Sequence, residues 1–230
     1  MNSGNEDQTI KGEKKIEVKR FGNPQLFSIE YSLLDNPIDD SGYLKESWGN
    51  FALIVDGKNI CEHEVENETY KYVWYLDNIV GWFSSNLIYV LGYDPYPLPV
   101  KGDSVQELIL NSERHVPEED DEEYYWYHAK SSWTMRHNWF SSRGGSYLPN
   151  IYFRRVEREI EIVWDNSIYR DSQVIFSQAD GSVRLPLGEF KKVIFGFLND
   201  FYPNLLDKIP QSRTADRQSI ERMWRKFKLL

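Results

Sequence analysis

The stretch from Ile151 to Trp164, IYFRRVEREIEIVW, decides the fold class of this chain. Two segments of alternating apolar and polar residues, Ile151–Val156 and Glu159–Trp164, are joined by a short polar turn. Side chains alternate between the two faces of a strand, so the apolar residues of the second segment point the same way: Ile160, Ile162 and Trp164. This pattern predicts an antiparallel hairpin with one face buried.

Similar patterns predict further strands before and after this hairpin. Asp-Gly pairs favour the positive φ angles of tight turns. We therefore expect one hairpin about Asp56-Gly57, between Trp48–Val55 and Asn59–Glu64, and another about Asp180-Gly181, between Gln173–Ser177 and Ser182–Leu185. Strand character is also expected at Lys15–Phe21, Leu26–Tyr31 and Tyr70–Trp74.

Several segments have the 3.6-residue periodicity of helices instead. Apolar residues recur at helical spacing from Leu76 to Leu91, and Gly92 is a natural stop. The remaining helices are expected at Ser104–Leu110, at Tyr124–Phe140 with an end at Gly144-Gly145, from Phe190 to a stop at Pro203, and at Thr214–Lys228.

Strands and helices do not alternate strictly along the chain, which argues against a doubly wound parallel sheet. We therefore predict an α+β fold of antiparallel hairpins packed against amphipathic helices. The predicted organisation is a disordered N-terminal tail over 1–13, a single α+β domain over 14–206 and a basic amphipathic C-terminal helix over 207–230.

Composition limits the functional classes. The net charge is −9, and an acidic body is unlike a general nucleic-acid binder. No apolar run is long enough to cross a bilayer or serve as a secretory signal, so we expect a cytoplasmic protein without membrane contact. The single cysteine, Cys61, excludes an intrachain disulfide. The motifs GxGxxG, GxxxxGK[ST], HExxH and GxSxG are absent, and we expect neither a cofactor nor a metal.

One candidate ligand site lies at the predicted end of the helix over 124–140. It comprises Arg136, His137, Asn138 and Arg143. A guanidinium, an imidazole and an amide beside Gly144-Gly145 would suit an anion or a peptide carboxylate. The alternative is structural, because Arg and His stabilise a helix C-terminus and Gly ends it.

A candidate partner site lies on the C-terminal helix. It comprises Arg217, Met223, Trp224, Arg225 and Phe227. The apolar residues recur at helical spacing and require a partner surface. That surface is either this protein's own core, another subunit, or nucleic acid contacted through the basic residues.

Acidic clusters give three weaker candidates. The run Glu118–Glu123 is either a solvated helix start or a docking site for a basic partner. Glu62-His63-Glu64 with Glu66 resembles a cluster for a divalent metal ion, but on a strand His63 would face away from Glu62 and Glu64. Glu159 and Glu161 share one strand face, as in metal-dependent nucleases, or simply form the polar face of a sheet.

Four segments resemble an uncharacterised bacterial domain that occurs with ImmA/IrrE-type metallopeptidase proteins and in phage-defence loci. They are Asp77–Phe83, Arg136–Trp139, Gly145–Arg154 and Ile160–Trp164, and the resemblance spans about residues 47–202. The peptidase motif HExxH is missing here, so no catalytic residue can be transferred. The resemblance implies an accessory or sensing domain beside a separate effector.

We therefore expect a non-enzymatic binding or regulatory subunit of a bacterial complex, with antiphage defence as its setting and a larger effector subunit as its partner. Two alternatives are a metal-dependent nuclease or nucleotide-processing enzyme using Glu159, Glu161 and His137, and a small-anion or peptide-end sensor using the site at Arg136–Arg143.

Overall fold

The computed structural model describes residues 17–38, 44–115, 120–143 and 146–230, without the side chains of 120–121 and 140–143. The predicted disordered tail over 1–13 and the predicted helix end at Gly144-Gly145 lie outside the described residues. Within them no helix is long and apolar enough to span a membrane.

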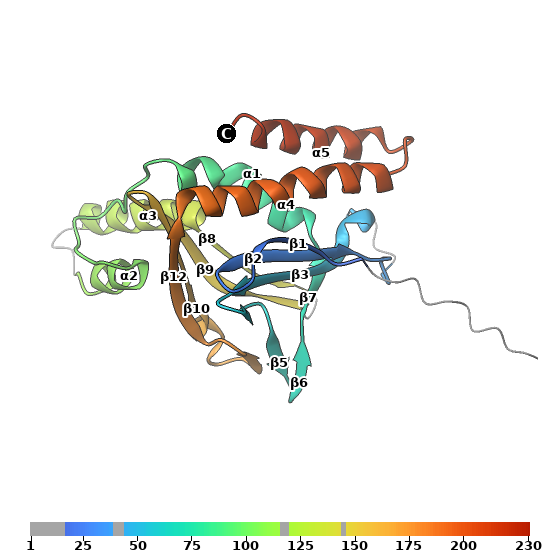
Figure 1. The fold of residues 1–230 in the computed structure, drawn as a ribbon. Helices are drawn as coiled ribbons and strands as arrows, with labels where there is room; N and C mark the ends of the chain where they lie inside the picture. The colour runs from blue at the N-terminus through green and yellow to red at the C-terminus, as the bar shows by residue number, and fades with distance from the viewer. Residues whose placement is uncertain (1–16, 39–43, 116–119, 144–145) are drawn as a thin grey trace, which may run out of the picture.

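The strands form antiparallel sheets, which confirms the predicted α+β class (Figure 1). The first sheet has the order β1 (Lys19–Asn23), β2 (Phe27–Leu33), β3 (Trp48–Val55) and β4 (Lys58–Asn59), with β7 (Tyr72–Tyr75) also paired to β3. The second has the order β12 (Asp180–Pro186), β10 (Glu159–Asp165), β9 (Ser146–Val156) and β8 (Asn138–Arg143). A small third sheet contains β11 (Val174–Phe176), β5 (His63–Val65) and β6 (Glu68–Tyr70).

The helix α4 (Leu187–Lys208) joins the two large sheets, contacting β1 and β2 of the first and β10 and β12 of the second. Its predicted apolar residues are all buried: Phe190, Val193, Ile194, Phe197, Leu198 and Phe201. The helix α1 (Asp77–Leu91) contributes to the same core and ends at Gly92, as its periodicity predicts. Burial of these large side chains against both sheets supplies the main driving force for folding.

The helix α5 (Thr214–Phe227) lies against α1 and α4, on the side of α4 away from the sheets (Figure 1). Ile220 and Phe227 are each 2% exposed, and the Phe227 ring meets Phe195 edge to face at 4.9 Å between centroids. The apolar side of α5 is therefore covered by the protein's own helices.

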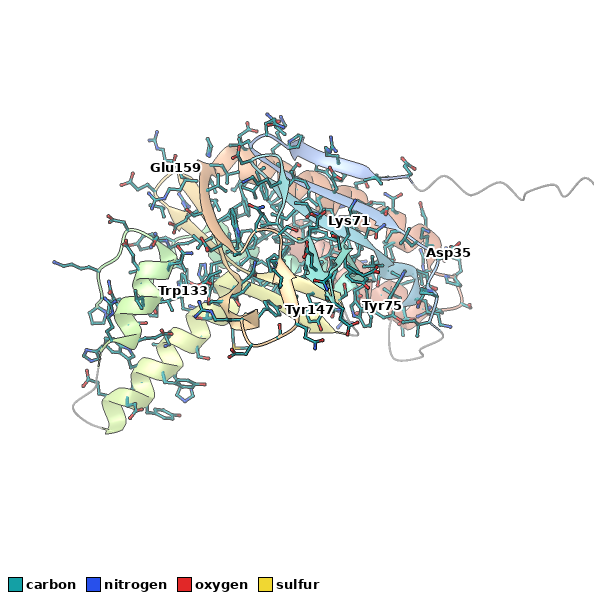
Figure 2. All side chains as sticks on the ribbon, turned by 90° about the horizontal axis from the view of Figure 1, so that it is seen from below. Asp35, Lys71, Tyr75, Trp133, Tyr147 and Glu159 are labelled. Carbon is teal, nitrogen blue, oxygen red and sulfur yellow. The ribbon has the colours of Figure 1, made fainter. Side chains whose placement is uncertain are left out.

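The helices α2 (Val105–Glu113) and α3 (Asp120–His137) extend to one side of the sheets (Figures 1 and 2). Trp133, labelled in Figure 2, is fully buried against Val105 and Val163, and its indole N–H donates to the Asp94 carbonyl. Trp133 thus anchors α3 to the second sheet.

Three sequence predictions were wrong. The helix expected over 124–140 ends at His137, because Trp139 packs into the core from β8, which pairs with β9. The segments expected to form a hairpin about Asp180-Gly181 pair elsewhere, β11 with β5 and β12 with β10.

The helix α4 also continues through Pro203. Proline lacks one backbone donor, which costs a hydrogen bond. The buried Tyr202, Leu205 and Leu206 on either side keep the segment helical against that cost. A smaller difference concerns Asn59–Glu64, which is predicted to form the second strand of the hairpin about Asp56-Gly57. Only Lys58 and Asn59 pair with β3, and His63 begins a strand of the third sheet.

Candidate functional site

The predicted ligand site at the end of α3 is held by Asp94 from the loop after α1. The Arg136 guanidinium donates to both Asp94 carboxylate oxygens, at 2.8 and 3.2 Å. The His137 ring lies between two acceptors, with Nδ1 2.7 Å from the Phe153 carbonyl and Nε2 3.0 Å from Asp94. The structure therefore brings Arg136 and His137 together, around a carboxylate of the protein itself.

Electrostatics fit a structural role for this cluster. Burial raises the pKa of Asp94, but hydrogen bonds with Arg136 and His137 outweigh it and hold that pKa below its usual value. Burial also lowers the pKa of His137. A neutral His137 ring has one N–H and serves only one of its two acceptors at a time.

Asn138 belongs to a separate buried network. Its amide donates to the Asn150 side chain at 2.7 Å and to the Ile151 carbonyl at 3.0 Å. The side chain of Arg143 lies outside the described residues. The donors of Arg136 and Asn138 are thus engaged within the fold, and the geometry does not favour the anion-sensor alternative.

The predicted partner residues of α5 also contact the protein's own fold. Arg217 donates to the carbonyls of Leu206 and Ile209, at 2.5 and 2.8 Å. Phe227 is buried, and the Trp224 ring stacks on Tyr202 at 6.3 Å.

The two other residues of the predicted partner site on α5 are Met223 and Arg225. Met223 packs partly buried against the core, near Gly81. Arg225 is exposed and approaches Glu221 at 3.5 Å. Of the predicted set only Arg225 is classed as exposed.

The acidic residues considered for metal binding are engaged in ion pairs or lie apart. Glu161 is 2% exposed, and its carboxylate accepts from Arg154 at 2.8 Å and Arg184 at 3.3 Å. His63 is buried while Glu64 is exposed, as strand alternation predicts. Among the described residues, no group of three or more His, Cys, Asp or Glu side chains could hold a metal ion.

The outer side of α3 has a different character. Its inward line contains Trp126, Trp133 and His137, at helical spacing. The opposite side exposes a group that we call the tyrosine face: Tyr124, Tyr125, Tyr127, His128 and Met135. The three tyrosines and Met135 are 61%, 71%, 62% and 73% exposed, in the same order.

The rings of the tyrosine face touch one another. Tyr124 lies 5.8 Å from Tyr125 and 4.2 Å from His128, and Tyr127 lies 5.6 Å from His128, between ring centroids. Glu122 and Glu123 are exposed at the N-terminal end of the same helix. The result is a contiguous aromatic surface beside negative charge.

Sequence reasoning missed this surface. On α3, burial follows the line through Trp126 and Trp133. The sequence pattern that could have indicated the buried side is the seven-residue spacing of Trp126 and Trp133, which places both on one side of a helix. Tyr124 and Tyr127 then fall outside the buried line.

A family model described as a family of unknown function (DUF5984) matches residues 48–221. The chain belongs to this family. The match spans most of the chain, from the start of β3 into α5. The matched region of this chain contains both the Asp94 cluster and the tyrosine face.

Other comparisons give little more for this DUF5984 member. A similar solved structure is the crystal structure of CdiI from Burkholderia dolosa AUO158, at 14% identity and a TM-score of 0.38, covering 79% of this chain and 99% of that one. A likeness at this level carries nothing about function. No curated protein matches the chain.

Proposed function

We propose that this DUF5984 member is a non-enzymatic binding or regulatory subunit, and that it docks a basic protein partner through the tyrosine face of α3. The observation that carries the proposal is the exposure of Tyr124, Tyr125 and Tyr127 in one ring-to-ring cluster. Tyr and Met are enriched at protein interfaces, and contiguous exposed apolar patches mark interaction sites.

The negative charge beside the tyrosine face indicates that the partner surface is basic. The acidic run Glu118–Glu123 adjoins the tyrosine face in sequence, and the described Glu122 and Glu123 are exposed. Complementary charges steer association and suppress wrong partners. A basic protein surface with grooves for tyrosine rings is the complementary partner.

The wider proposal concerns the setting of this contact. The partner is a larger effector subunit, and the complex is bacterial, cytoplasmic and active in antiphage defence. The support is the resemblance of Asp77–Phe83 and Ile160–Trp164 to a domain associated with such loci, together with the absence of standard catalytic motifs.

Site-specific photocrosslinking in the native host tests the docking site. A photoreactive amino acid at Tyr125 or Tyr127 should capture one and the same protein, and the same label at Arg222, exposed on α5, should not. Capture from Arg222 but not from the α3 positions would contradict the proposal.

Binding of the captured protein, once purified, gives the second measurement. The variant Tyr124→Ser/Tyr125→Ser/Tyr127→Ser should weaken binding by more than tenfold, since interface tyrosines often contribute about 1–2 kcal/mol each. The matched control is Arg222→Ala. Added salt should weaken binding of the wild type, because the docking is electrostatically assisted. Equal affinity of the triple variant would remove α3 from the interface.

A further inference from the structure

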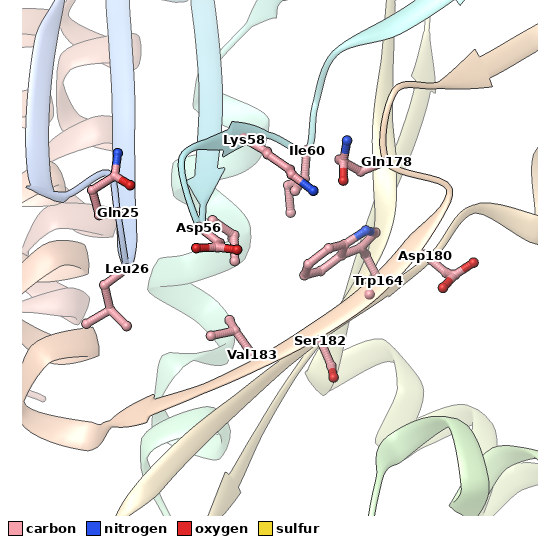
Figure 3. Close-up of a pocket in the computed structure, with 12 residues that line it drawn as sticks. Gln25, Leu26, Asp56, Lys58, Ile60, Trp164, Gln178, Asp180, Ser182 and Val183 are labelled. Carbon is pink, nitrogen blue, oxygen red and sulfur yellow. The ribbon is translucent and has the colours of Figure 1, made fainter.

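The third sheet projects from the side of the molecule opposite α5, as β5 and β6 show in Figure 1. Two of its connections to the large sheets border a cleft of about 380 Å³ (Figure 3). Ile60 lines this cleft from the segment before β5, and Gln178 lines it from the segment after β11. The cleft leaves both connections without packing on one side, so the third sheet relies on its buried face for attachment.

The buried face of the third sheet packs through aromatic rings. His63 on β5 and Phe176 on β11 are cross-strand partners. The Tyr147 ring of β9 meets the His63 ring edge to face at 5.4 Å between centroids. Tyr169 lies in the short 3-10 helix η2 (Asn166–Tyr169), 5.2 Å from Phe176 between centroids. The third sheet is thus attached to β9 and η2 through a cluster of rings that includes His63.

His63 is the unusual member of this cluster. It is fully buried, and its Nδ1 lies 3.1 Å from the Cys61 carbonyl. A carbonyl only accepts, so Nδ1 carries the proton of the neutral ring and Nε2 is left as an acceptor. That Nε2 is buried and has no hydrogen-bond partner among the described residues. Since a buried acceptor without a donor lowers stability, an apolar ring would suit packing better at this position.

The rings around His63 supply no negative charge to a protonated imidazole. Tyr70 of β6 and Tyr147 of β9 lie 6.1 and 5.4 Å from the His63 ring between centroids. Phe176 of β11 lies 5.5 Å away and is apolar, and Tyr169 of η2 packs behind Phe176. Tyrosine side chains are uncharged at acid pH.

Glu62 and Glu68 are acids close to His63 in the sheet. The Glu62 carboxylate accepts from the Ser177 hydroxyl at 3.1 Å, and Glu68 is exposed on β6, where it pairs with Val65. Burial outweighs the backbone hydrogen bond of His63 and the attraction of Glu62, and it holds the pKa of His63 below its ordinary value.

We propose that His63 is an acid-sensitive latch of the third sheet. While its ring is neutral, the third sheet stays packed against β9 and η2. Protonation of Nε2 places a positive charge among aromatic rings, where burial of a charge is unfavourable, so the ring leaves and the third sheet separates from β9. The latch is separate from the tyrosine face and does not rest on the function proposed for it.

Linkage between protonation and folding fixes the pH range of the latch. The ordinary pKa of histidine is about 6.5, and the pKa of packed His63 is lower. The contribution of the packed ring to stability is therefore complete above about pH 6.5 and is lost as pH falls toward the folded-state pKa. Over that range the equilibrium constant for opening rises by as much as tenfold per pH unit, or about thirtyfold by pH 5.

Hydrogen–deuterium exchange with mass spectrometry tests the latch. Wild type and His63→Phe are compared at the same pH, because intrinsic exchange depends on pH. From about pH 7.5 to about pH 5, the ratio of wild-type to variant exchange rates should rise by as much as about thirtyfold in peptides of β5, β6 and β11. These peptides should also exchange faster than those of α4, which shows opening without global unfolding.

The other histidines are controlled for in the same experiment. His137 is buried in both proteins, so its titration cancels from the ratio. The matched control is His128→Phe, an exposed position on α3, which should keep the wild-type response to pH.

Two outcomes of the exchange experiment would overturn the proposal. A ratio that is the same at both pH values would remove His63 as the sensor. Third-sheet peptides that exchange only as slowly as α4 would show that the sheet does not separate by itself. If His63→Phe does not fold, NMR titration of the wild-type His63 ring decides. We expect it to titrate below the ordinary histidine range, and a folded-state pKa at or above about 6.5 would contradict the latch.

Discussion

The helices α3 and α5 lie at the periphery of the sheets, carry aromatic residues and differ in charge. The basic α5 buries its apolar line, including Ile220 and Phe227, against α1 and α4. The acidic α3 is anchored by Trp133 and leaves three tyrosines exposed. The strongly amphipathic helix thus docks on its own protein, whereas the helix with exposed aromatic rings is the one for which we propose a partner.

The largest expected effect comes from replacing Trp133, the side chain that anchors α3 to the second sheet. Trp133→Ala removes a fully buried ring, its stack on His137 at 4.2 Å and its hydrogen bond to Asp94. We expect a loss of about 3–5 kcal/mol in the free energy of unfolding, measured by urea denaturation. Trp133→Phe keeps a ring and should cost less. Wild-type stability of Trp133→Ala would mean that α3 is not anchored there.

The next effect tests the docking of α5. Ile220→Ala should lower the free energy of unfolding by about 2–4 kcal/mol, because the side chain is buried between helices. Arg222→Ala, two residues along on the exposed side, should change it by less than about 0.5 kcal/mol. An equal change in the free energy of unfolding for both variants would mean that α5 does not pack against α1 and α4.

Local patterns determined what could be predicted from the sequence. The hairpin of β9 and β10, the end of α1 at Gly92 and the buried face of α4 all depend on neighbours in sequence. Periodicity and turn residues encode these directly.

The missed features depend on contacts between distant segments. The pairing of β11 with β5 joins residues more than one hundred positions apart, and α3 ends where Asn138 meets Asn150. The candidate site shows the same limit. The sequence indicates that the polar Arg136 and the apolar Trp224 each require a contact. It does not show that Arg136 binds Asp94, or that Trp224 stacks on Tyr202, within the same chain.

A smaller effect comes from Asp94, which links α3 to the body through Arg136 and His137. Its pKa is below the usual value when folded, so its contribution to stability is present above about pH 4. That contribution is lost as pH falls through the folded-state pKa. Asp94→Asn should therefore cost about 1–2 kcal/mol at pH 7.

The pH dependence separates the charge of Asp94 from its shape. The stability difference between wild type and Asp94→Asn should shrink as pH falls below about 4, measured by urea denaturation across pH. A difference that stays constant from pH 7 to pH 3 would assign the effect to hydrogen-bond geometry alone.

The smallest expected effect completes the comparison of α3 with α5. Single changes of Tyr124, Tyr125 or Tyr127 to Ser should alter the free energy of unfolding by less than about 0.5 kcal/mol, since these side chains are exposed and their ring contacts lie within the exposed tyrosine face. A residue that adds nothing to stability while exposing a large ring is best explained by a contact outside the chain. If instead one of these variants lost 2 kcal/mol or more (~2 kcal/mol marks a buried role), the tyrosine face would be part of the fold, and α3 would resemble α5 in serving its own protein.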